Sequence, residues 1–363
     1  MRTPTPRPER DVPTTDFAAR VIAWQRAHGR HDLPWQNTRD PYRIWLSEIM
    51  LQQTQVAAVI GYYARFLERF PTLAALAAAS VDEVLALWSG LGYYSRARNL
   101  HACAQRLMAE HGGHFPSDPD LLAQLPGIGR STAAAIAAFA FGARAAILDG
   151  NVKRVFARHF GVEGWPNTPA IERALWQRAQ DLLPDGDQAA IAAYTQGLMD
   201  LGATLCTRSR PRCADCPLRA TCVALRTDRT AELPAARPKK AVPTRYAHVL
   251  VALCAGEVLV EKRPPTGIWG GLWSLPQFDD EQALQAAAAR LGATHIDAWP
   301  ERKHAFTHYT LRFTPHLAQV RSRTPSAQAP GLMWLPLSDR AGAALPTPVR
   351  RLFDDLAEAS GAA

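Results

Sequence analysis

The sequence lacks the features of membrane and secreted proteins. No apolar run approaches the ~20 residues that cross a bilayer. Residues 1–14 carry charge but no apolar stretch, so we expect a disordered tail there and no secretory signal. Only six cysteines occur in 363 residues, and four of them are bunched. This usage indicates a metal site in a reducing compartment rather than a disulfide scaffold.

Acidic residues are in deficit. The 41 Lys and Arg outnumber the 33 Asp and Glu, and the formal net charge is +8. Such an excess favours a polyanionic partner, although many basic proteins bind none. Hydrophobic residues form 47% of the chain, which is ample for packed cores, and the length predicts two or three domains of about 100–200 residues.

Strand-like alternation is missing before Cys206. The apolar residues recur at helical spacing instead, most clearly over Tyr42–Tyr63 and Ser131–Phe141. We therefore predict an all-α domain over residues 15–223. Residues 224–245 are polar and contain three prolines, which predicts a linker.

The segment after this linker has a different pattern. His248–Cys254 and Val258–Arg263 are strand-like and flank a short turn with glycine, which predicts a hairpin. Later segments predict a helix, an alternating strand and a closing helix: Glu281–Leu291, Ala305–Leu317 and Pro348–Ala357. Residues 246–363 are therefore predicted to form an α+β domain.

A glycine-rich turn occupies Leu125–Thr132 in the helical part. Gly127 and Gly129 allow a tight turn, and backbone amides at the start of the following helix attract phosphate. The next apolar run leads to Asp149. The turn would hold this carboxylate at a fixed distance from a nucleic-acid backbone. From the segment alone, a plain helix connection followed by a surface Asp is an equally good interpretation.

Glu48 is the only charged side chain between Arg43 and Arg65. Burial among apolar neighbours would raise its pKa and keep it protonated as a general acid, although a solitary Glu more often faces solvent. A polar patch on this predicted helix, Gln52–Gln55, suits contact with base edges. With Asp149, Glu48 would form a carboxyl pair of the kind that cleaves glycosidic bonds.

Four cysteines share one short loop: Cys206, Cys213, Cys216 and Cys222. Four thiolates bind zinc or an iron–sulfur cluster. Structural zinc sites usually have two short C-x-x-C arms, but only one such pair is present, so the spacing favours iron–sulfur. Four arginines among the cysteines give the loop a basic surface suited to phosphates.

At this point the chain resembles the MutY adenine DNA glycosylases of the helix-hairpin-helix superfamily. Besides the cysteine pattern, four segments carry the resemblance: Leu33–Val56, Gly90–Leu100, Leu125–Ala133 and Leu148–Val155. It implies an all-α glycosylase domain whose four cysteines hold a [4Fe-4S] cluster, followed by a Nudix-like α+β domain. The implied activity is release of adenine that faces 8-oxoguanine or guanine in double-stranded DNA.

The resemblance also implies catalytic roles. Glu48 would protonate adenine at N7, Asp149 would stabilise the sugar cation, and Asn151 would position Asp149 or the attacking water. Ser131 stands where bifunctional relatives and endonuclease III carry a lysine. A serine cannot form a Schiff base, so strong β-lyase activity is not expected.

Further residues would contact DNA by the same resemblance. The flipped adenine would be lined by Trp35, Leu51 and Gln196, and the turn with Gly127 and Gly129 would hold the DNA backbone. Two side chains would push into the duplex and one would lie near the oxidised guanine: Gln53, Tyr93 and Thr54.

The Nudix-like domain would recognise 8-oxoguanine through the tip of a hairpin: Phe306, Thr307 and His308. Two departures from the family are visible. Thr307 replaces the usual Ser, and the acids that hold Mg²⁺ in Nudix hydrolases are missing from the segment before Gly292. Nucleotide hydrolysis is therefore not expected.

Three other functions stay open at this stage. A non-catalytic iron–sulfur protein that binds damaged DNA would need neither Glu48 nor Asp149. An endonuclease III-like glycosylase and lyase is disfavoured by Ser131, and a Nudix pyrophosphatase by the missing acids. We expect a monomer that binds no membrane and works in the bacterial cytoplasm, associated with the nucleoid through DNA.

Overall fold

The computed structural model describes residues 14–238, 241–306, 308–323 and 331–359. The chain divides into two compact units. The first comprises Met1–Tyr63 and Arg106–Lys239, and the second comprises Ala64–Gln105 and Lys240–Ala363. None of the described helices is both long and apolar enough to cross a membrane.

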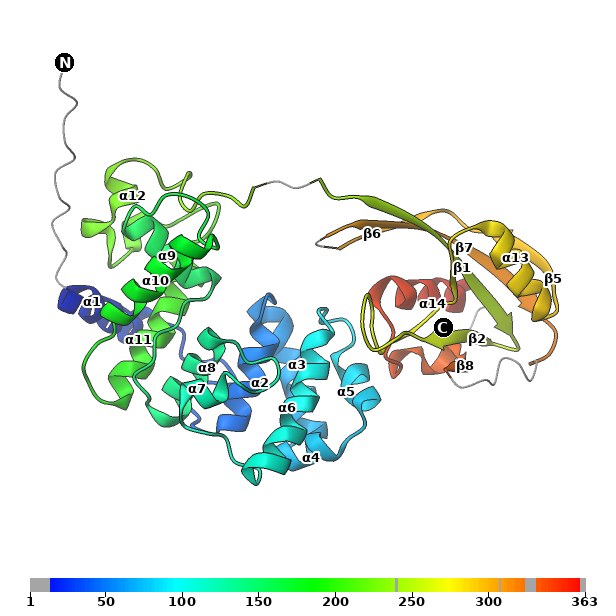
Figure 1. The fold of residues 1–363 in the computed structure, drawn as a ribbon, viewed down its shortest axis with the longest axis horizontal. Helices are drawn as coiled ribbons and strands as arrows, with labels where there is room; N and C mark the ends of the chain where they lie inside the picture. Colours follow the sequence, from blue (N-terminus) through cyan, green and yellow to red (C-terminus); the bar gives the residue numbers. More distant parts are fainter. Residues whose placement is uncertain (1–13, 239–240, 307, 324–330, 360–363) are drawn as a thin grey trace, which may run out of the picture. The chain divides into compact units, whose positions relative to one another are not determined.

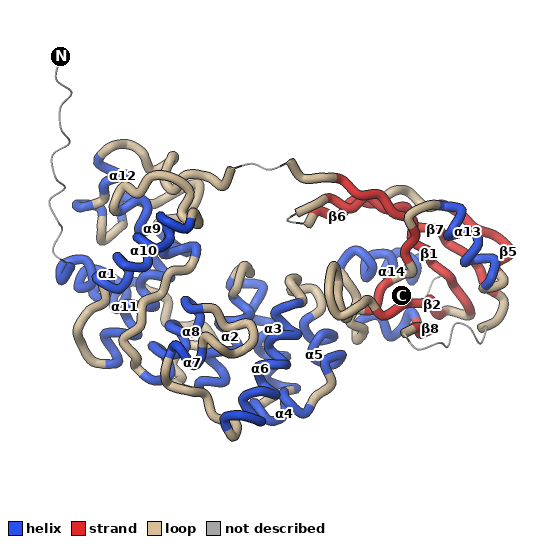
Figure 2. Tube along the Cα trace, in the orientation of Figure 1, coloured by secondary structure: helices blue, strands red, loops and turns tan. Residues whose placement is uncertain are grey.

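The described residues of the first unit form helices joined by loops and contain no strand, as predicted (Figures 1 and 2). Two helices run from one unit into the other: α3 (Val56–Arg69) and α6 (Ser95–His111). The other α-helices are α1 (Thr14–His28), α2 (Pro41–Leu51), α7 (Pro119–Leu122), α8 (Arg130–Ile136), α9 (Gly150–His159), α10 (Pro169–Asp181), α11 (Gln188–Asp200) and α12 (Val223–Arg226). Short π- and 3₁₀-helical turns lie between these helices: η1 (Ala137–Phe141), η2 (Leu201–Leu205), η3 (Cys213–Asp215) and η4 (Arg219–Thr221).

One hydrophobic core joins the ends of this unit's sequence. Helix α1 packs against α11, and Phe17 and Val21 of α1 are buried with Phe156 of α9 and Leu198 of α11. The segment Ala146–Leu148, which leads to Asp149, is buried in the same core. This packing fixes the start of α9.

The long helix predicted over Tyr42–Tyr63 is wrong. The structure has α2, a break at Gln52–Gln55, and then α3. Gln53 adopts the left-handed region with φ of 59°, and the Gln52 amide Nε2 donates to Thr132 Oγ1 at 3.3 Å. The polar residues therefore form a loop that is held by a distant helix, and this tertiary contact overrides helix propensity.

The helix predicted over Ser131–Phe141 is present, and it consists of two consecutive segments of different helix type. Helix α8 continues into the π-helical turn η1, which ends at Gly142 with φ of 72°. The left-handed glycine terminates the helix without a Cβ clash.

The second unit contains part of α3 and α6, two short helices and the predicted α+β domain. The short helices are α4 (Leu73–Ala78) and α5 (Val81–Trp88). Ser80 and Glu83 form a capping box at the start of α5, in which each side chain accepts a hydrogen bond from the other's backbone N–H.

A mixed sheet forms the centre of the α+β part. Its strands are β1 (Thr244–Cys254), β2 (Glu257–Lys262), β3 (Trp273–Ser274), β4 (Gln277–Phe278), β5 (Ala293–Ala298), β6 (Arg302–Ala305), β7 (Thr310–Val320) and β8 (Leu332–Pro336). The main order is β3-β2-β1-β7-β5, and β1 and β7 are parallel. The predicted β1–β2 hairpin is confirmed by the antiparallel pair Leu253 and Val258.

Side chains of β1 alternate between two cores. Val249 and Val251 pack with α14 (Thr347–Ala359), which follows the turn η6 (Leu337–Ala341). Leu250 and Ala252 pack on the other face with α13 (Glu281–Arg290). The two predicted helices are thus confirmed, and they cover opposite faces of the sheet (Figure 1).

Two predictions in this part need correction. The single strand that the alternation predicts over Ala305–Leu317 starts only at Thr310, as β7, because the chain reverses between Ala305 and Thr310; a hairpin tip in this place is what the resemblance implied. The linker expected over residues 224–245 is structured at both ends, since it begins within α12 and ends in β1. Leu233 is buried and its carbonyl accepts from Arg158 Nε at 2.7 Å, so this segment packs onto the first unit.

Candidate active site

Glu48 lies on α2 and lines a pocket of about 600 Å³. The helix begins at Pro41 under the cap of Asp40, whose side chain accepts from the Tyr42 N–H at 2.9 Å. Its other side chains are largely buried, including Trp45 and Met50. This packing leaves the pocket as the accessible side of Glu48.

Burial raises the pKa of Glu48 to about 8, and the negative charge of Asp149 contributes to the rise. The carboxyl is therefore mostly protonated at neutral pH, as a general acid must be. The charge effect also shows that these two carboxyl groups lie within electrostatic reach, although they are 101 positions apart in sequence.

Asp149 is the N-cap of α9, and its Oδ1 accepts from the Val152 N–H at 2.7 Å. Burial raises the pKa of Asp149, while the backbone N–H groups of Val152 and Asn151 lower it, as do the charges of Arg154 and Lys153. The helix N-terminus also favours a negative charge. The net effect is a raised pKa, but Asp149 is held in place by N–H donors and lies near two cations that would stabilise its ionised form.

Ser131 supports the backbone beside Asp149. Its Oγ accepts a hydrogen bond of 3.0 Å from the N–H of Leu148. The contact joins the start of α8 to the residue that precedes Asp149. No Lys occupies position 131 to act as an amine nucleophile.

Asn151 faces a cation rather than the pocket lining. Its Oδ1 accepts from Arg154 Nη2 at 2.8 Å, and the same nitrogen donates to the Gly202 carbonyl at 2.7 Å. A Cβ at position 202 would lie 2.4 Å from Asn151 Cβ, so only glycine permits this approach. Asn151 therefore fixes the first turn of α9.

The pocket brings Glu48 together with three predicted residues: Trp35, Leu51 and Gln196. The ring of Trp35 is buried and meets Tyr63 edge to face, with 5.5 Å between centroids. A planar apolar wall of this kind suits a base.

Two residues of this region were missed by the sequence analysis. Asp200 is fully buried, and it accepts from Gln196 Nε2 at 2.8 Å and from Arg30 Nε at 2.7 Å. Arg30 also lines the pocket. The spacing of four residues between Gln196 and Asp200 on an apolar helix was a usable signal for the first contact, but nothing in the sequence indicates Arg30.

The glycine-rich turn lies between α7 and α8. Gly127 has φ of 77°, which L-residues rarely adopt, and Gly129 is the N-cap of α8 without a side chain over the helix start. Gln52 Nε2 lies 3.5 Å from the Gly127 carbonyl. The turn therefore exposes backbone N–H groups next to the loop of Gln52–Gln55.

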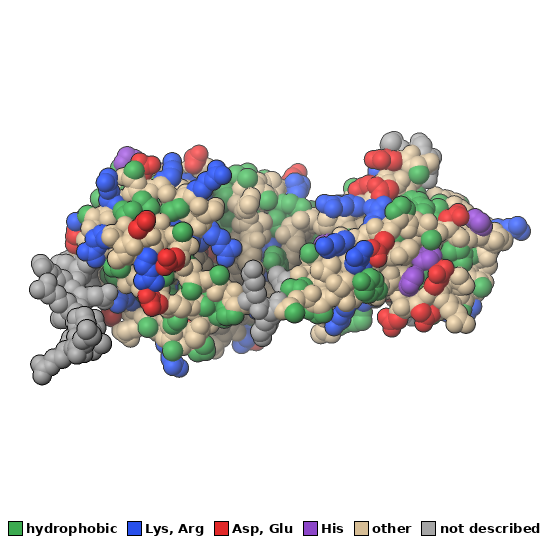
Figure 3. Space-filling model, turned by 90° about the horizontal axis from the view of Figure 1, so that it is seen from above, with side chains coloured by type: hydrophobic (Ala, Val, Ile, Leu, Met, Phe, Trp, Pro, Cys, Tyr) green, Lys and Arg blue, Asp and Glu red, His purple; other side chains and the backbone are tan. Residues whose placement is uncertain are grey.

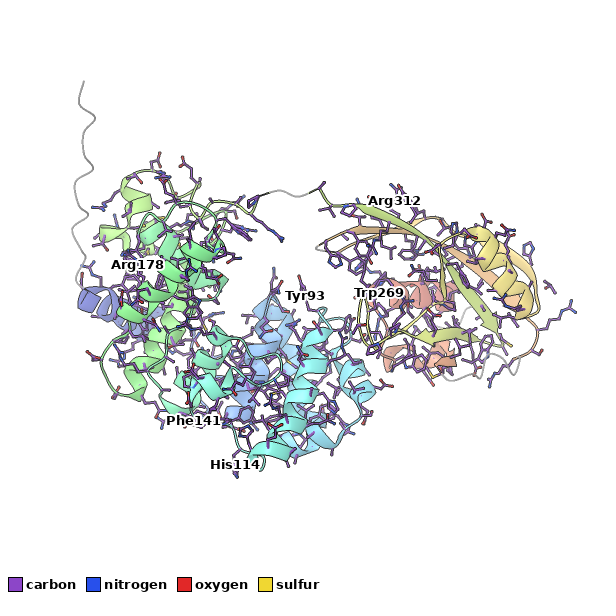
Figure 4. The ribbon with its side chains drawn as sticks, in the orientation of Figure 1. Tyr93, His114, Phe141, Arg178, Trp269 and Arg312 are labelled. Atoms are coloured by element: carbon purple, nitrogen blue, oxygen red, sulfur yellow. The ribbon has the colours of Figure 1, made fainter. Side chains whose placement is uncertain are left out.

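Gln53 and Tyr93 are exposed and both have left-handed backbones, with φ of 59° and 48°. Such non-glycine residues cost about 1–3 kcal/mol and concentrate at functional sites. Thr54, beside Gln53, is partly buried. Figure 4 labels Tyr93, whose side chain is 46% exposed and borders the guanidinium of Arg96 at 5.6 Å.

The four cysteines are free thiols of intermediate exposure. Burial raises the pKa of Cys216 to about 11, and the charges of the other three cysteines add to the rise, so the four lie near one another. Within the described ranges, no three metal-binding side chains converge as ligands of a single ion.

Buried Arg158 supports this cysteine loop. Its Nη1 lies 3.4 Å from Cys206 Sγ and 2.7 Å from the Thr207 carbonyl, and its Nη2 donates to the Arg208 carbonyl at 2.9 Å. Its own carbonyl lies 3.6 Å from Cys222 Sγ. The loop therefore folds around a positive charge that would balance thiolates.

The turn between β6 and β7 carries the residues predicted for lesion recognition. The Phe306 N–H donates to the Tyr309 carbonyl at 2.9 Å, and the Phe306 ring lies 5.6 Å from that of Trp269, which Figure 4 labels. His308 lies 6.3 Å from Phe306 between ring centroids. Thr307 falls outside the described residues.

Basic side chains occur on both the helical and the sheet-containing parts, interspersed with acidic ones (Figure 3). This distribution suits contact with phosphates at several points rather than through one patch.

Comparison with known proteins gives two family matches. Residues 46–181 match the HhH-GPD superfamily base excision DNA repair protein, and residues 248–355 match the NUDIX domain. The adenine DNA glycosylase of Buchnera aphidicola subsp. Baizongia pistaciae is 35% identical over 94% of this chain and 96% of its own. The Homo sapiens adenine DNA glycosylase is 34% identical, over 95% of this chain and 74% of its own. A solved thermostable thymine-DNA glycosylase is 30% identical with a TM-score of 0.54, over 59% of this chain and 97% of its own.

Proposed function

Since the chain belongs to the family of adenine DNA glycosylases, we propose that it releases adenine that faces 8-oxoguanine or guanine in double-stranded DNA. It is a hydrolase of N-glycosyl bonds that acts in base-excision repair of adenine mispairs. The observation that carries the finer proposal is the carboxyl pair, in which Glu48 lines the pocket with a pKa of about 8 beside the charge of Asp149.

The reaction divides between the two carboxyl groups. Glu48 gives its proton to N7 of the flipped adenine, and the C1′–N9 bond breaks with its electron pair going to the base. The Asp149 carboxylate stabilises the resulting sugar cation. Water then attacks C1′, and its proton passes to the Glu48 carboxylate, which restores the acid.

Positioning residues surround this pair. Trp35, Leu51 and Gln196 would hold the flipped adenine in the pocket. Ser131 and Asn151 would keep Asp149 at the start of α9, through Leu148 in the first case and Arg154 in the second. With serine in place of an amine nucleophile, the enzyme would be monofunctional.

DNA would be held outside the pocket by three groups of residues. Backbone N–H groups at Gly127 and Gly129 would bind phosphate. Gln53 and Tyr93 would fill the duplex around the mispair with Thr54 close by, and the hairpin residues Phe306, Thr307 and His308 would contact 8-oxoguanine. We further propose a monomer that acts in the bacterial cytoplasm, where its DNA substrate lies.

The four cysteines would hold a [4Fe-4S] cluster: Cys206, Cys213, Cys216 and Cys222. Bound there, the cluster would cross-link the loop that follows α11 and fix its arginines for phosphate contact. The positive charge of buried Arg158 between these thiols supports this assignment.

The proposal is tested by incubating the purified protein with labelled duplexes in which adenine faces 8-oxoguanine, guanine or thymine. We expect alkali-sensitive strands with the first two and little with the third. Absence of adenine release from both mispairs would reject the proposal.

A borohydride trap in the same reactions separates the alternatives. An endonuclease III-like lyase would give a covalent protein–DNA adduct, whereas we expect none because Ser131 has no amine. Binding to the mispair without any base release would instead indicate a damage-binding protein that lacks catalysis.

A further inference from the structure

Residues 89–94 join α5 to α6 and carry Tyr93; we name them the Tyr93 loop. The first residue, Ser89, is buried, and its hydroxyl is hydrogen-bonded on both sides. Ser89 Oγ donates to the Leu345 carbonyl at 2.8 Å and accepts from Arg350 Nη2 at 2.8 Å. These partners lie 256 and 261 residues later in the sequence.

Tyr94 adds a second tie to the same place. Its hydroxyl donates to the Leu345 carbonyl at 3.4 Å and accepts from the Gly90 N–H at 3.3 Å. Both ends of the Tyr93 loop are thus fastened to one carbonyl group of the α+β part.

The interior of the loop is also held firmly. Trp88 Nε1 and Arg96 Nη2 each donate to the Gly92 carbonyl at 3.1 Å. These bonds maintain the left-handed backbone of Tyr93, which persists only where its surroundings over-determine it. The loop therefore presents Tyr93 to solvent from a rigid frame.

Arg350 connects this frame to the segment before α14. Besides Ser89, its Nη2 donates to the Ala343 carbonyl at 3.0 Å, and its Nη1 donates to the Ala341 carbonyl at 3.3 Å. One planar guanidinium thus sets the spacing between the Tyr93 loop and residues 341–345.

Helix α14 also shares a core with the β6–β7 hairpin. Val349 and Phe353 of α14 are buried in the same cluster as Tyr309, and Phe306 packs against that cluster. A shift at the hairpin tip therefore reaches α14 through close-packed side chains, which transmit displacement because cores have few voids.

We propose that Arg350 and Ser89 form a positioning pair that couples the hairpin at Phe306 to Tyr93, so that contact with 8-oxoguanine sets the placement of Tyr93 in the duplex. The inference rests on the proposed roles of Tyr93 and of the hairpin. It adds residues that touch neither DNA nor adenine and act through Tyr93 alone.

The test is a double-mutant cycle in the full chain, measured as single-turnover adenine release. Arg350→Ala should slow release opposite 8-oxoguanine by about tenfold, a size typical of coupled neighbours. Opposite guanine the change should stay below about twofold, because the hairpin has no oxidised base to sense. In a Tyr93→Ala background, adding Arg350→Ala should change the rate by less than about twofold.

Arg290→Ala is the matched control, because Arg290 is an exposed arginine on α13, which packs on the opposite face of the sheet from α14. It should leave both rates unchanged. Ser89→Ala repeats the cycle from the other side of the contact, and it decides the question if Arg350→Ala does not fold.

Two outcomes would overturn the coupling while the parent enzyme stays active: equal slowing opposite 8-oxoguanine and guanine, or full multiplication of the two single effects in the double variant. Either outcome would show that the contact between Arg350 and Ser89 stabilises the fold without coupling the hairpin to Tyr93. A parent that releases no adenine would instead reject the proposed function, and this inference with it.

Discussion

Arg154 Nε donates a hydrogen bond of 2.7 Å to the backbone carbonyl of Cys206, the first cysteine of the loop. The same guanidinium donates to Asn151 Oδ1 at 2.8 Å, in the first turn of α9. One side chain therefore links the cysteine loop to the helix that Asp149 caps. A loop that is distant from Asp149 in sequence can in this way fix the proposed catalytic carboxylate.

Replacing Arg154 by Met should slow adenine release without removing the proposed cluster. Loss of hydrogen bonds from a charged group costs about 1.5–3 kcal/mol. Part of this cost would raise the barrier to adenine release, because Asp149 would be less well positioned. We expect roughly a tenfold lower single-turnover rate with the visible absorption of the protein retained. Arg106→Met is the control, since the partners of Arg106 among the described residues are Glu110 and the Gln124 carbonyl, far from α9 in sequence. A parent-like rate in Arg154→Met would contradict the link.

The rate of adenine release should depend on pH through the carboxyl pair. Glu48 must be protonated, so the rate should fall as pH rises through about 8, where its carboxyl ionises. Asp149 must be ionised, so the rate should also fall in acid, at a pH above the ordinary Asp value of about 3.9, because burial raises its pKa. Single-turnover rates across this range provide the check. The range from pH 7 to pH 9 spans the pKa of Glu48, which is about 8. A rate that stays constant over this range would exclude Glu48 as the acid.

The same pKa shift predicts an effect on stability. The pKa of Glu48 is about 8 in the folded chain and about 4.3 when unfolded. Between these two pH values the folded state therefore keeps a proton on Glu48 that the unfolded state has lost. Its contribution to stability is full below about pH 4 and is lost as pH rises through 8. Glu48→Gln removes this loss. Its gain in melting temperature over the parent should therefore increase from pH 5 to pH 8, and a gain independent of pH would refute the buried-acid assignment.

Ser131→Ala should weaken both folding and catalysis. The variant leaves the Leu148 N–H without its 3.0 Å partner, at a cost of about 1–3 kcal/mol in free energy of unfolding. Because Leu148 precedes Asp149, adenine release should also slow. Ser131→Thr keeps the hydroxyl and serves as the control. Denaturant unfolding and single-turnover rates measure the two effects, and an unchanged unfolding midpoint would show that the hydrogen bond contributes nothing.

Local patterns predicted the elements whose boundaries depend on local chemistry. The β1–β2 hairpin followed from two alternating runs around a glycine turn, and α13 from its helical spacing. The break at Gln52–Gln55 has no Gly or Pro to mark it, because it depends on the contact between Gln52 and Thr132, 80 residues away. Local patterns cannot contain such a contact.

The candidate site shows the same division. Glu48 and Asp149 were candidates from the sequence, as an isolated acid in an apolar helix and an acid after an apolar run, but a plain structural interpretation stayed open for each and their roles came from the family resemblance. Arg30 and Arg350 were not, since an arginine looks alike whether it lies in solvent or holds a buried Asp200 or Ser89. Their roles come from packing between distant segments.

Single-turnover adenine release by Glu48→Gln and Asp149→Asn, measured with enzyme in excess over a duplex containing adenine opposite 8-oxoguanine, tests the central claim most directly. The account predicts a rate at least about 100-fold below the parent for each variant, the lower range for loss of a general acid, with DNA binding preserved in a gel-shift control. Release by either variant at close to the parent rate would contradict it.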